Sequence, residues 1–192
     1  MKRKQFLLLF MFLAIFSCER DDICAESTST TPRLIIEFYD VDSPEDLKNV
    51  PRISVYGEEL FVDENGVFTP PTESSDSIVE YDGTVLFDVN SNTIGLPLLI
   101  GTEGDDVTTR FLLEKDTNLR IDDDPTATSN LDIIEISYIP QFEYVSRACG
   151  YKSIFTELDI TIDSDGDDWI DDIEIDVVNI ENENTVHVRI FH

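Results

Sequence analysis

Apolar and polar residues alternate along most of the chain beyond about residue 32, which is the pattern of strands with one buried face. Leu34, Ile36 and Phe38 fall on one side of the first such strand. No convincing stretch repeats at 3.6 residues. Other segments show the same alternation and are rich in the β-branched and aromatic residues that sheets favour. The residues expected to share a face in each are Ile53 and Val55; Val85, Phe87 and Val89; Ile154, Leu158, Ile160 and Ile162; and Val186, Val188 and Ile190.

Two dipeptides mark tight turns between the expected strands. Asn65-Gly66 follows a strand that ends near Val62, and Asp82-Gly83 separates residues 78–81 from residues 84–89. Both dipeptides supply the positive φ values that two-residue hairpin loops need. Polar stretches at residues 70–77 and 122–130 are expected to be loops. Roughly ten short strands at this spacing predict an all-β, antiparallel two-sheet sandwich of the Ig-like kind, with a small barrel as the second choice.

The first residues have the features of a secretory signal peptide. Residues 2–4 are basic, and residues 6–16 are an unbroken apolar run. These eleven residues are too few to cross a bilayer as a helix, which needs about 20. The string Ile15-Phe16-Ser17-Cys18 resembles a bacterial lipobox, which implies cleavage before Cys18 and acylation of its sulfur. An ordinary signal peptide with an incidental cysteine is the alternative.

These features divide the chain into a signal peptide at residues 1–17, a lipid-anchored segment at residues 18–31 and a single sandwich domain at residues 32–192. A chain of 192 residues suits one domain. Acyl chains on Cys18 would anchor the protein in the outer membrane, at the cell surface or on the periplasmic face, since each buried CH₂ contributes about 0.8 kcal/mol. Residues 19–22 resemble the surface-export signal of Bacteroidota-type lipoproteins, and a solvated acidic linker is the alternative.

The charge balance is strongly acidic. The chain has 13 Lys and Arg against 41 Asp and Glu, and its formal net charge is −28. Removing residues 1–17 removes three basic residues, so the mature charge is 10 − 41 = −31. We expect no nucleic-acid partner, because phosphate binding needs a basic surface that displaces counterions.

Three cysteines become one pair if Cys18 carries lipid. Cys24 and Cys149 then remain, and an oxidising envelope favours a disulfide between them over two free thiols, which are the alternative. They lie 125 positions apart, and closing so long a loop is worth roughly 4–5 kcal/mol in the chain-entropy model. Five residues separate Cys18 from Cys24, and six extended steps reach at most about 20 Å. Such a bridge would hold the domain close to the membrane.

Residues 163–174 form the segment with the strongest candidate chemistry. They resemble the twelve-residue calcium loops of EF-hands and thrombospondin type 3 repeats, in which alternate residues converge the six to eight oxygens that Ca²⁺ prefers. Calcium is the one cofactor that this resemblance implies. The implied ligands are the carboxylates of Asp163, Asp165, Asp167 and Glu174, the carbonyl of Trp169 and, through water, Asp171.

Two features favour a different hypothesis for this segment. Asp168 occupies the sixth position, where the calcium pattern has glycine. Trp169, Ile173 and Ile175 alternate, so Glu174 is expected on a strand. The alternative is a hairpin turn between a strand ending at Ile162 and one starting near Trp169, with Asp and Gly serving the turn geometry. Both hypotheses stay open.

The remaining polar residues give no catalytic signature. His187 and His192 are five apart, on opposite faces of one strand, so we expect separate exposed or half-buried histidines and no metal pair. The chain contains no G-x-S-x-G, no phosphate-binding glycine loop and no H-E-x-x-H. We therefore expect a protein that is not an enzyme.

Several strings together resemble a family of Bacteroidota-type lipoproteins of unknown function, occasionally labelled calcium-binding. They are residues 18–24 (CERDDIC), 31–40 (TPRLIIEFYD), 145–152 (VSRACGYK) and 187–192 (HVRIFH). The resemblance supports lipidation of Cys18 and pairing of Cys24 with Cys149, and it implies a setting beside outer-membrane barrel proteins. Our leading hypothesis is a non-enzymatic, lipid-anchored accessory subunit that binds an outer-membrane barrel or a second lipoprotein. The alternative is a calcium-binding β module.

Overall fold

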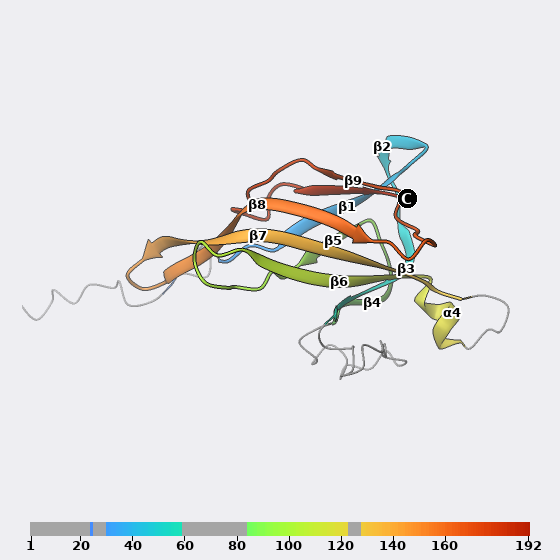
Figure 1. Cartoon of the computed structure of the whole chain (residues 1–192), viewed down its shortest axis with the longest axis horizontal. Coiled ribbons are helices and arrows are strands. Elements are labelled where there is room, and N and C mark those ends of the chain that lie inside the picture. The colour runs from blue at the N-terminus through green and yellow to red at the C-terminus, as the bar shows by residue number, and fades with distance from the viewer. Residues whose placement is uncertain (1–23, 25–29, 59–83, 123–127) are drawn as a thin grey trace, which may run out of the picture.

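The computed structural model describes residue 24 and residues 30–58, 84–122 and 128–192. Within these residues, strands dominate and one short helix is present (Figure 1). The elements are β1 (Leu34–Asp40), β2 (Ser43–Leu47), β3 (Val50–Gly57), β4 (Thr84–Ser91), β5 (Thr93–Leu96), β6 (Val107–Lys115), α4 (Thr117–Ile121), β7 (Asn130–Ser146), β8 (Gly150–Asp163), β9 (Asp172–Ile175) and β10 (Val188–Phe191).

The strands form two sheets that pack as a sandwich. The first sheet has the order β2-β1-β10-β9, with β5 also pairing with β1, and the second has the order β4-β3-β6-β7-β8. Neither described sheet closes on itself, so the predicted all-β sandwich is confirmed and the barrel alternative is wrong. Antiparallel pairs dominate, and β1 and β10 add a parallel pair. This pair joins strands from opposite ends of the chain, which alternation within single strands does not predict.

The core lies between the sheets and follows the predicted alternation in most strands. Leu34, Ile36 and Phe38 are fully buried, as are Val188 and Ile190 on the neighbouring β10. The second sheet contributes the buried side chains Ile53, Val55, Leu113, Ile134 and Ile136. Apolar burial of this kind stabilises by about 25 cal/mol per Å² of surface removed from water.

Two predicted faces are wrong because a strand changes phase. In β4, Val85 and Leu86 pack against the core while Val89 is exposed, and the register against β3 shifts where Asp88 adopts a φ of 53°. Val85, Phe87 and Val89 therefore do not share a buried face. An irregularity of this kind moves the following side chains to the other side of the strand.

The same change occurs in β8, where Phe155 is buried in place of the predicted Ile154. Leu158 and Ile160 continue the buried face after Glu157, whose φ is 57°. The register between β7 and β8 shifts at this point. One extra residue on β8 thus explains why Ile154 and Leu158 lie on different faces.

Some expectations fall on other parts of the chain. The signal peptide, Cys18, the turns at Asn65-Gly66 and Asp82-Gly83, the stretch 70–77 and residues 123–127 lie outside the described residues. Among the residues that the structure does describe, no helix is long and apolar enough to cross a membrane. The short helix α4 was not predicted, since five residues are too few for a 3.6-residue repeat.

Candidate functional site

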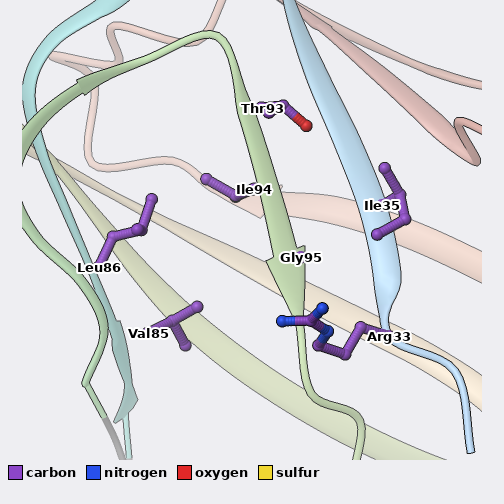
Figure 2. Close-up of a pocket in the computed structure, with 7 residues that line it drawn as sticks. All are labelled: Arg33, Ile35, Val85, Leu86, Thr93, Ile94 and Gly95. Atoms are coloured by element: carbon purple, nitrogen blue, oxygen red, sulfur yellow. The ribbon is translucent and has the colours of Figure 1, made fainter. Parts of the chain in front are cut away.

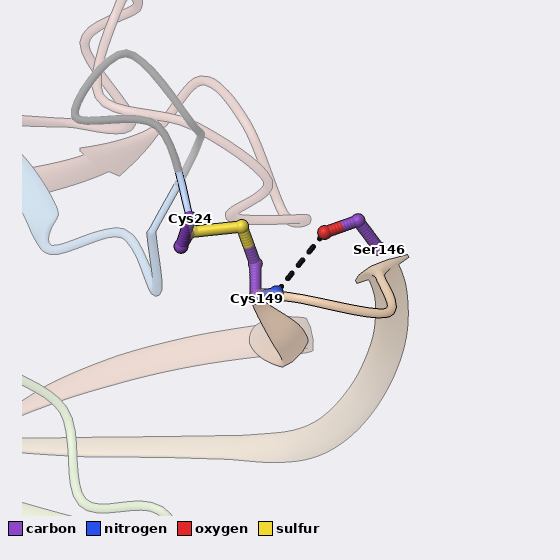
Figure 3. Close-up of a disulfide and its surroundings, with 3 residues drawn as sticks. All are labelled: Cys24, Ser146 and Cys149. Carbon is purple, nitrogen blue, oxygen red and sulfur yellow. Dashed lines mark hydrogen bonds between the residues drawn. A yellow bond between two sulfur atoms is a disulfide. The ribbon is translucent and has the colours of Figure 1, made fainter. Parts of the chain in front are cut away.

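A disulfide joins the N-terminal segment to the tip of the β7–β8 hairpin (Figure 3). The sulfurs of Cys24 and Cys149 are 2.04 Å apart and their Cα atoms are 4.9 Å apart, so the pair predicted from the cysteine count is the one that the structure joins. Cys149 lies in the turn between β7 and β8, where its N–H donates to Ser146 Oγ at 3.0 Å. The next residue, Gly150, has a φ of 72°, which glycine adopts without strain.

A second contact fixes the same segment to the hairpin. The N–H of Ser153 on β8 donates to Thr31 Oγ1 at 3.0 Å. Two residues further along, Arg33 forms an ion pair with Glu183, whose Oε2 is 3.0 Å from Nη2. Thr31 and Arg33 thus hold the chain to the sandwich just before β1 begins. We call the part of the molecule with Cys24, Cys149 and the β7–β8 turn the hairpin end.

The inner face of β7 changes from buried to exposed as it approaches the hairpin end. Every second residue from Asp132 to Pro140 is buried. The next two on that face, Phe142 and Tyr144, are 40% and 58% exposed, and Tyr151 on β8 is 67% exposed. The hairpin reaches beyond the other strands at this end of the molecule (Figure 1). We call Phe142, Tyr144 and Tyr151 the aromatic face.

The aromatic face is an ordered arrangement. Tyr144 and Tyr151 are partners across the two strands, and their rings meet edge to face with centroids 5.4 Å apart. The N–H of Phe142 donates to Glu103 Oε1 at 3.1 Å, so the β5–β6 loop lies along this part of β7. That loop carries two further exposed apolar side chains, Leu99 and Ile100. Exposed aromatic and aliphatic side chains therefore lie on this part of the hairpin and on the neighbouring β5–β6 loop.

The predicted calcium ligands do not converge on one point, as the ligands of a calcium loop do. Asp163 ends β8, and its Oδ2 accepts a hydrogen bond from Arg110 Nη2 at 2.6 Å. Glu174 lies on β9, as expected, with its Oε2 3.2 Å from Arg189 Nη2. Asp165 Oδ1 accepts from the N–H of Asp167 at 2.9 Å. Within the described part of the chain, no three His, Cys, Asp or Glu side chains are grouped to hold a metal. Calcium binding stays a prediction.

Trp169 and Asp171 also have roles within the fold. Trp169 is buried, and its indole N–H donates to the carbonyl of Leu113 at 3.1 Å. The N–H of Asp171 donates to the carbonyl of Phe191 at 2.9 Å. The segment between β8 and β9 crosses from the second sheet to the first. The hairpin-turn alternative is therefore wrong, because β9 pairs with β10 and not with β8.

Sequence reasoning missed Asp132, which fixes this crossover. Its Oδ2 accepts from the N–H groups of Trp169 and Ile170 at 2.9 and 2.8 Å, while the buried Oδ1 has no hydrogen-bond partner among the described residues. Burial is the main cause that raises the pKa of Asp132 to about 6; the nearby charges of Asp168 and Asp165 add to it, and the two N–H donors oppose it. A signal existed, since Asp132 precedes Ile134 and Ile136 on the inward face of its strand.

The two histidines are buried, so the expectation of exposed or half-buried side chains is wrong. His187 Nδ1 accepts from the N–H of Ile35 at 2.9 Å, and His192 packs edge to face against Trp169 at 5.6 Å between centroids. Burial lowers the pKa of both imidazoles. The two histidines therefore have separate roles: His187 is bonded to β1, and His192 packs against the ring of Trp169.

A buried polar cluster lies at the end opposite the hairpin. Glu114 on β6 is buried and receives two hydrogen bonds from Arg120 of α4, at 2.6 and 2.8 Å. Ser129 Oγ donates to Glu114 at 2.6 Å and Tyr56 OH donates to it at 3.3 Å. Burial raises the pKa of Tyr56. Since the carboxylate is matched by the guanidinium and two hydroxyls, this cluster stabilises the attachment of α4.

A pocket of about 280 Å³ lies between the edge strands β4 and β5 (Figure 2). Val85 and Leu86 line one side, and Thr93, Ile94 and Gly95 line the other. Arg33 closes one end, but its guanidinium is already paired with Glu183. The pocket lining is about as polar as it is apolar, and its one charged side chain is already bonded to Glu183.

The comparisons place the chain among proteins without an assigned role. The model of a family described as a family of unknown function (DUF6452) matches residues 67–192, about two thirds of the chain. The matched residues include Cys149 and all of β4 to β10, and they begin after Cys24. The searches of curated proteins and of solved structures gave no match.

Proposed function

The chain belongs to this family of unknown function, and from its own structure we propose that it is a non-enzymatic, lipid-anchored protein of a Bacteroidota-type outer membrane. It binds another outer-membrane protein, a barrel or a second lipoprotein, as an accessory subunit. The observation that carries the proposal is the disulfide between Cys24 and Cys149. This bond ties the domain to a residue only six positions after Cys18.

The short connection restricts where the domain can lie. Six extended steps span at most about 20 Å, so an acylated Cys18 holds the hairpin end within that distance of the lipid. The Thr31–Ser153 hydrogen bond keeps the following residues on the same hairpin. A domain on so short a connection stays beside its membrane neighbours, which suits a subunit that docks against one of them.

The end opposite the hairpin is the surface we assign to the partner. β7 spans 17 residues, so its start lies roughly 50 Å along the strand from the hairpin turn. Residues 163–174 at that end include seven acidic residues and no basic ones. A partner with a basic surface would be attracted to this end, since complementary charge steers association and selects among partners.

A role outside catalysis is supported by what the buried ionisable groups do. Glu114 is paired with Arg120, Asp132 holds two backbone N–H groups, and His187 accepts from Ile35. Each of these groups has a contact that stabilises the sandwich. None of the three is among the residues that line the pocket between β4 and β5.

Affinity purification of the tagged, lipidated protein from native membranes tests the proposal, once with calcium and once with chelator. We expect one outer-membrane protein to be recovered in stoichiometric amount in both conditions. Cys18→Ala should abolish acylation and reduce recovery of that protein at least tenfold, because the effective concentration that anchoring provides is lost. A protein that is recovered alone in several mild detergents would show the accessory role to be wrong.

A matched pair of variants tests the surface assignment. Asp165→Asn with Asp167→Asn removes two exposed charges from the acidic end, and Asp105→Asn with Asp106→Asn removes two from the β5–β6 loop. We expect the first pair to weaken recovery of the partner, most strongly at low salt, and the second pair to leave it unchanged. Equal effects of both pairs would contradict a partner at the acidic end.

A further inference from the structure

We infer that the aromatic face of the β7–β8 hairpin enters the headgroup region of the bilayer and sets the orientation of the domain on the membrane. Phe142, Tyr144 and Tyr151 make this contact. The inference rests on the proposed lipid anchor at Cys18 and goes beyond it, because an anchor alone leaves the domain free to lie in any direction.

The first argument is where the face is placed. Tyr144 and Tyr151 lie on the two strands that flank the turn with Cys149. The disulfide brings Cys24 to this turn, and the lipid-bearing residue is at most about 20 Å of extended chain away. The acyl chains and the aromatic face are therefore on the same side of the domain.

The second argument is that this face lacks a cover from the opposite sheet. It continues the inward side of β7, which is buried as far as Pro140. Beyond that residue, side chains of the type that fills the core are in contact with solvent. Exposed apolar surface of this kind marks an interaction site.

The third argument is charge. The hairpin at residues 141–153 contains Arg147 and Lys152 against the single acid Glu143, a net charge of +1 in a chain whose net charge is −28. Glu143 and Lys152 pair with each other at 3.0 Å, and Arg147 is exposed in the turn. An anionic lipid surface repels the acidic body and does not repel this hairpin. The charge of the hairpin itself and the tether thus favour the same orientation, while Glu103 of the β5–β6 loop adds one negative charge beside Phe142.

The side-chain types also suit a lipid interface. Tyrosine places an apolar ring in the acyl boundary and a hydroxyl among the headgroups, which is why it is enriched at this depth of membranes. The two tyrosine rings and the phenylalanine ring supply apolar area on one face, and Arg147 supplies a contact for lipid phosphate.

Depth-dependent quenching of tryptophan fluorescence tests the inference. The full-length lipidated protein is reconstituted into vesicles of brominated phosphatidylcholine, with acylation verified by the mass of the N-terminal peptide. The sole tryptophan, Trp169, is buried and gives the same background in every variant. Tyr151→Trp reports on the aromatic face, and Leu47→Trp, an exposed position on β2 at the other end, is the matched control.

We expect Tyr151→Trp to lose about half its added emission in these vesicles, more with bromine near the headgroups than with bromine near the bilayer centre. Leu47→Trp should keep its emission. An acylated protein in which Tyr151→Trp is not quenched, or is quenched no more than Leu47→Trp, would overturn the orientation while leaving the anchor in place. A protein without acyl chains would overturn the anchor and this inference together.

Discussion

The two ends of the sandwich differ in the side chains they expose and in the contacts that stabilise them. At the hairpin end, β7 and β8 extend past the other strands, expose aromatic rings and are tied covalently to the N-terminal segment. At the opposite end, β8 is followed by the acidic residues 163–174, and the buried carboxylate of Glu114 is bonded to the partly buried Arg120 of α4. Figure 1 shows the β7–β8 turn and α4 at opposite ends of these two strands.

We propose that this difference separates attachment to the membrane from recognition of a partner. The hairpin end has little net charge and much exposed ring surface, so it suits contact with lipid beside the anchor. The acidic end has charge that lipid would repel, so it suits a protein partner. The two ends also differ in what stabilises them, because the first depends on a covalent bond and the second on polar contacts within the fold. The following experiments separate these contributions.

The largest effect is expected from removing the disulfide. Cys24→Ser with Cys149→Ser should lower the free energy of unfolding by about 4 kcal/mol, since the unfolded chain regains the freedom of a long loop. The measurement is urea-induced unfolding followed by circular dichroism. Cys18→Ser in the same assay should leave the unfolding free energy unchanged. A loss of unfolding free energy below about 1 kcal/mol would show that the disulfide contributes little to the stability of the protein.

The buried cluster at the other end gives the next largest effect. Glu114→Ala should lower the free energy of unfolding by about 3 kcal/mol, because it leaves Arg120 partly buried without its carboxylate. Glu183→Ala removes the carboxylate from the exposed pair with Arg33 and should cost less than about 1 kcal/mol. Equal losses of unfolding free energy in these two variants would show that burial does not make the Glu114–Arg120 pair more stabilising than the exposed pair. Urea unfolding measures both.

The crossover at Asp132 predicts a pH dependence of smaller size. The pKa of this carboxyl is about 6 in the folded protein and 3.8 in its ordinary state, so the folded state holds a proton that the unfolded state releases between these values. The stability that Asp132 contributes therefore falls as pH rises from about 4 to about 6, by at most about 3 kcal/mol.

Asp132→Asn keeps an oxygen that accepts from the N–H groups of Trp169 and Ile170, and it removes the carboxyl group that titrates. We expect the unfolding free energy of this variant, measured from pH 4 to pH 7, to lack the decline assigned to Asp132. Asp159→Asn, at an exposed position on the partner strand β8, is the control and should follow the unmodified protein. A decline of the same size in Asp132→Asn would assign the pH dependence to other groups.

Alternation along single strands was enough to predict the sandwich and most of its core, because each strand buries one side. Leu34, Ile36 and Phe38 illustrate this, as they are buried together. The same rule failed at Asp88 and Glu157, where one residue with a positive φ changes the phase of the strand. Nothing in the local pattern marks these positions, since the phase change depends on the partner strand.

The candidate site was predicted unevenly for a similar reason. Counting cysteines was enough to select Cys24 and Cys149, because the acylation expected at Cys18 leaves only one pair. The aromatic face could not be predicted, because Phe142 and Tyr144 continue an alternation that is buried elsewhere in β7. Whether they are covered depends on how far the opposite sheet extends, which is a property of the assembled fold.

The smallest effect is expected from calcium, and it bears on the acidic end. A site with a dissociation constant near 1 mM would gain about 1.4 kcal/mol at ~10 mM Ca²⁺, enough to raise the melting temperature measurably. In the structure, Asp163 is bonded to Arg110 and Glu174 is paired with Arg189, so binding would first have to break two ion pairs. We therefore expect melting temperatures in calcium and in chelator that agree to within about one degree. A larger rise that is lost in Asp163→Ala with Asp165→Ala would instead establish the calcium site, and the acidic end would then need its ion before it could present a surface to a partner.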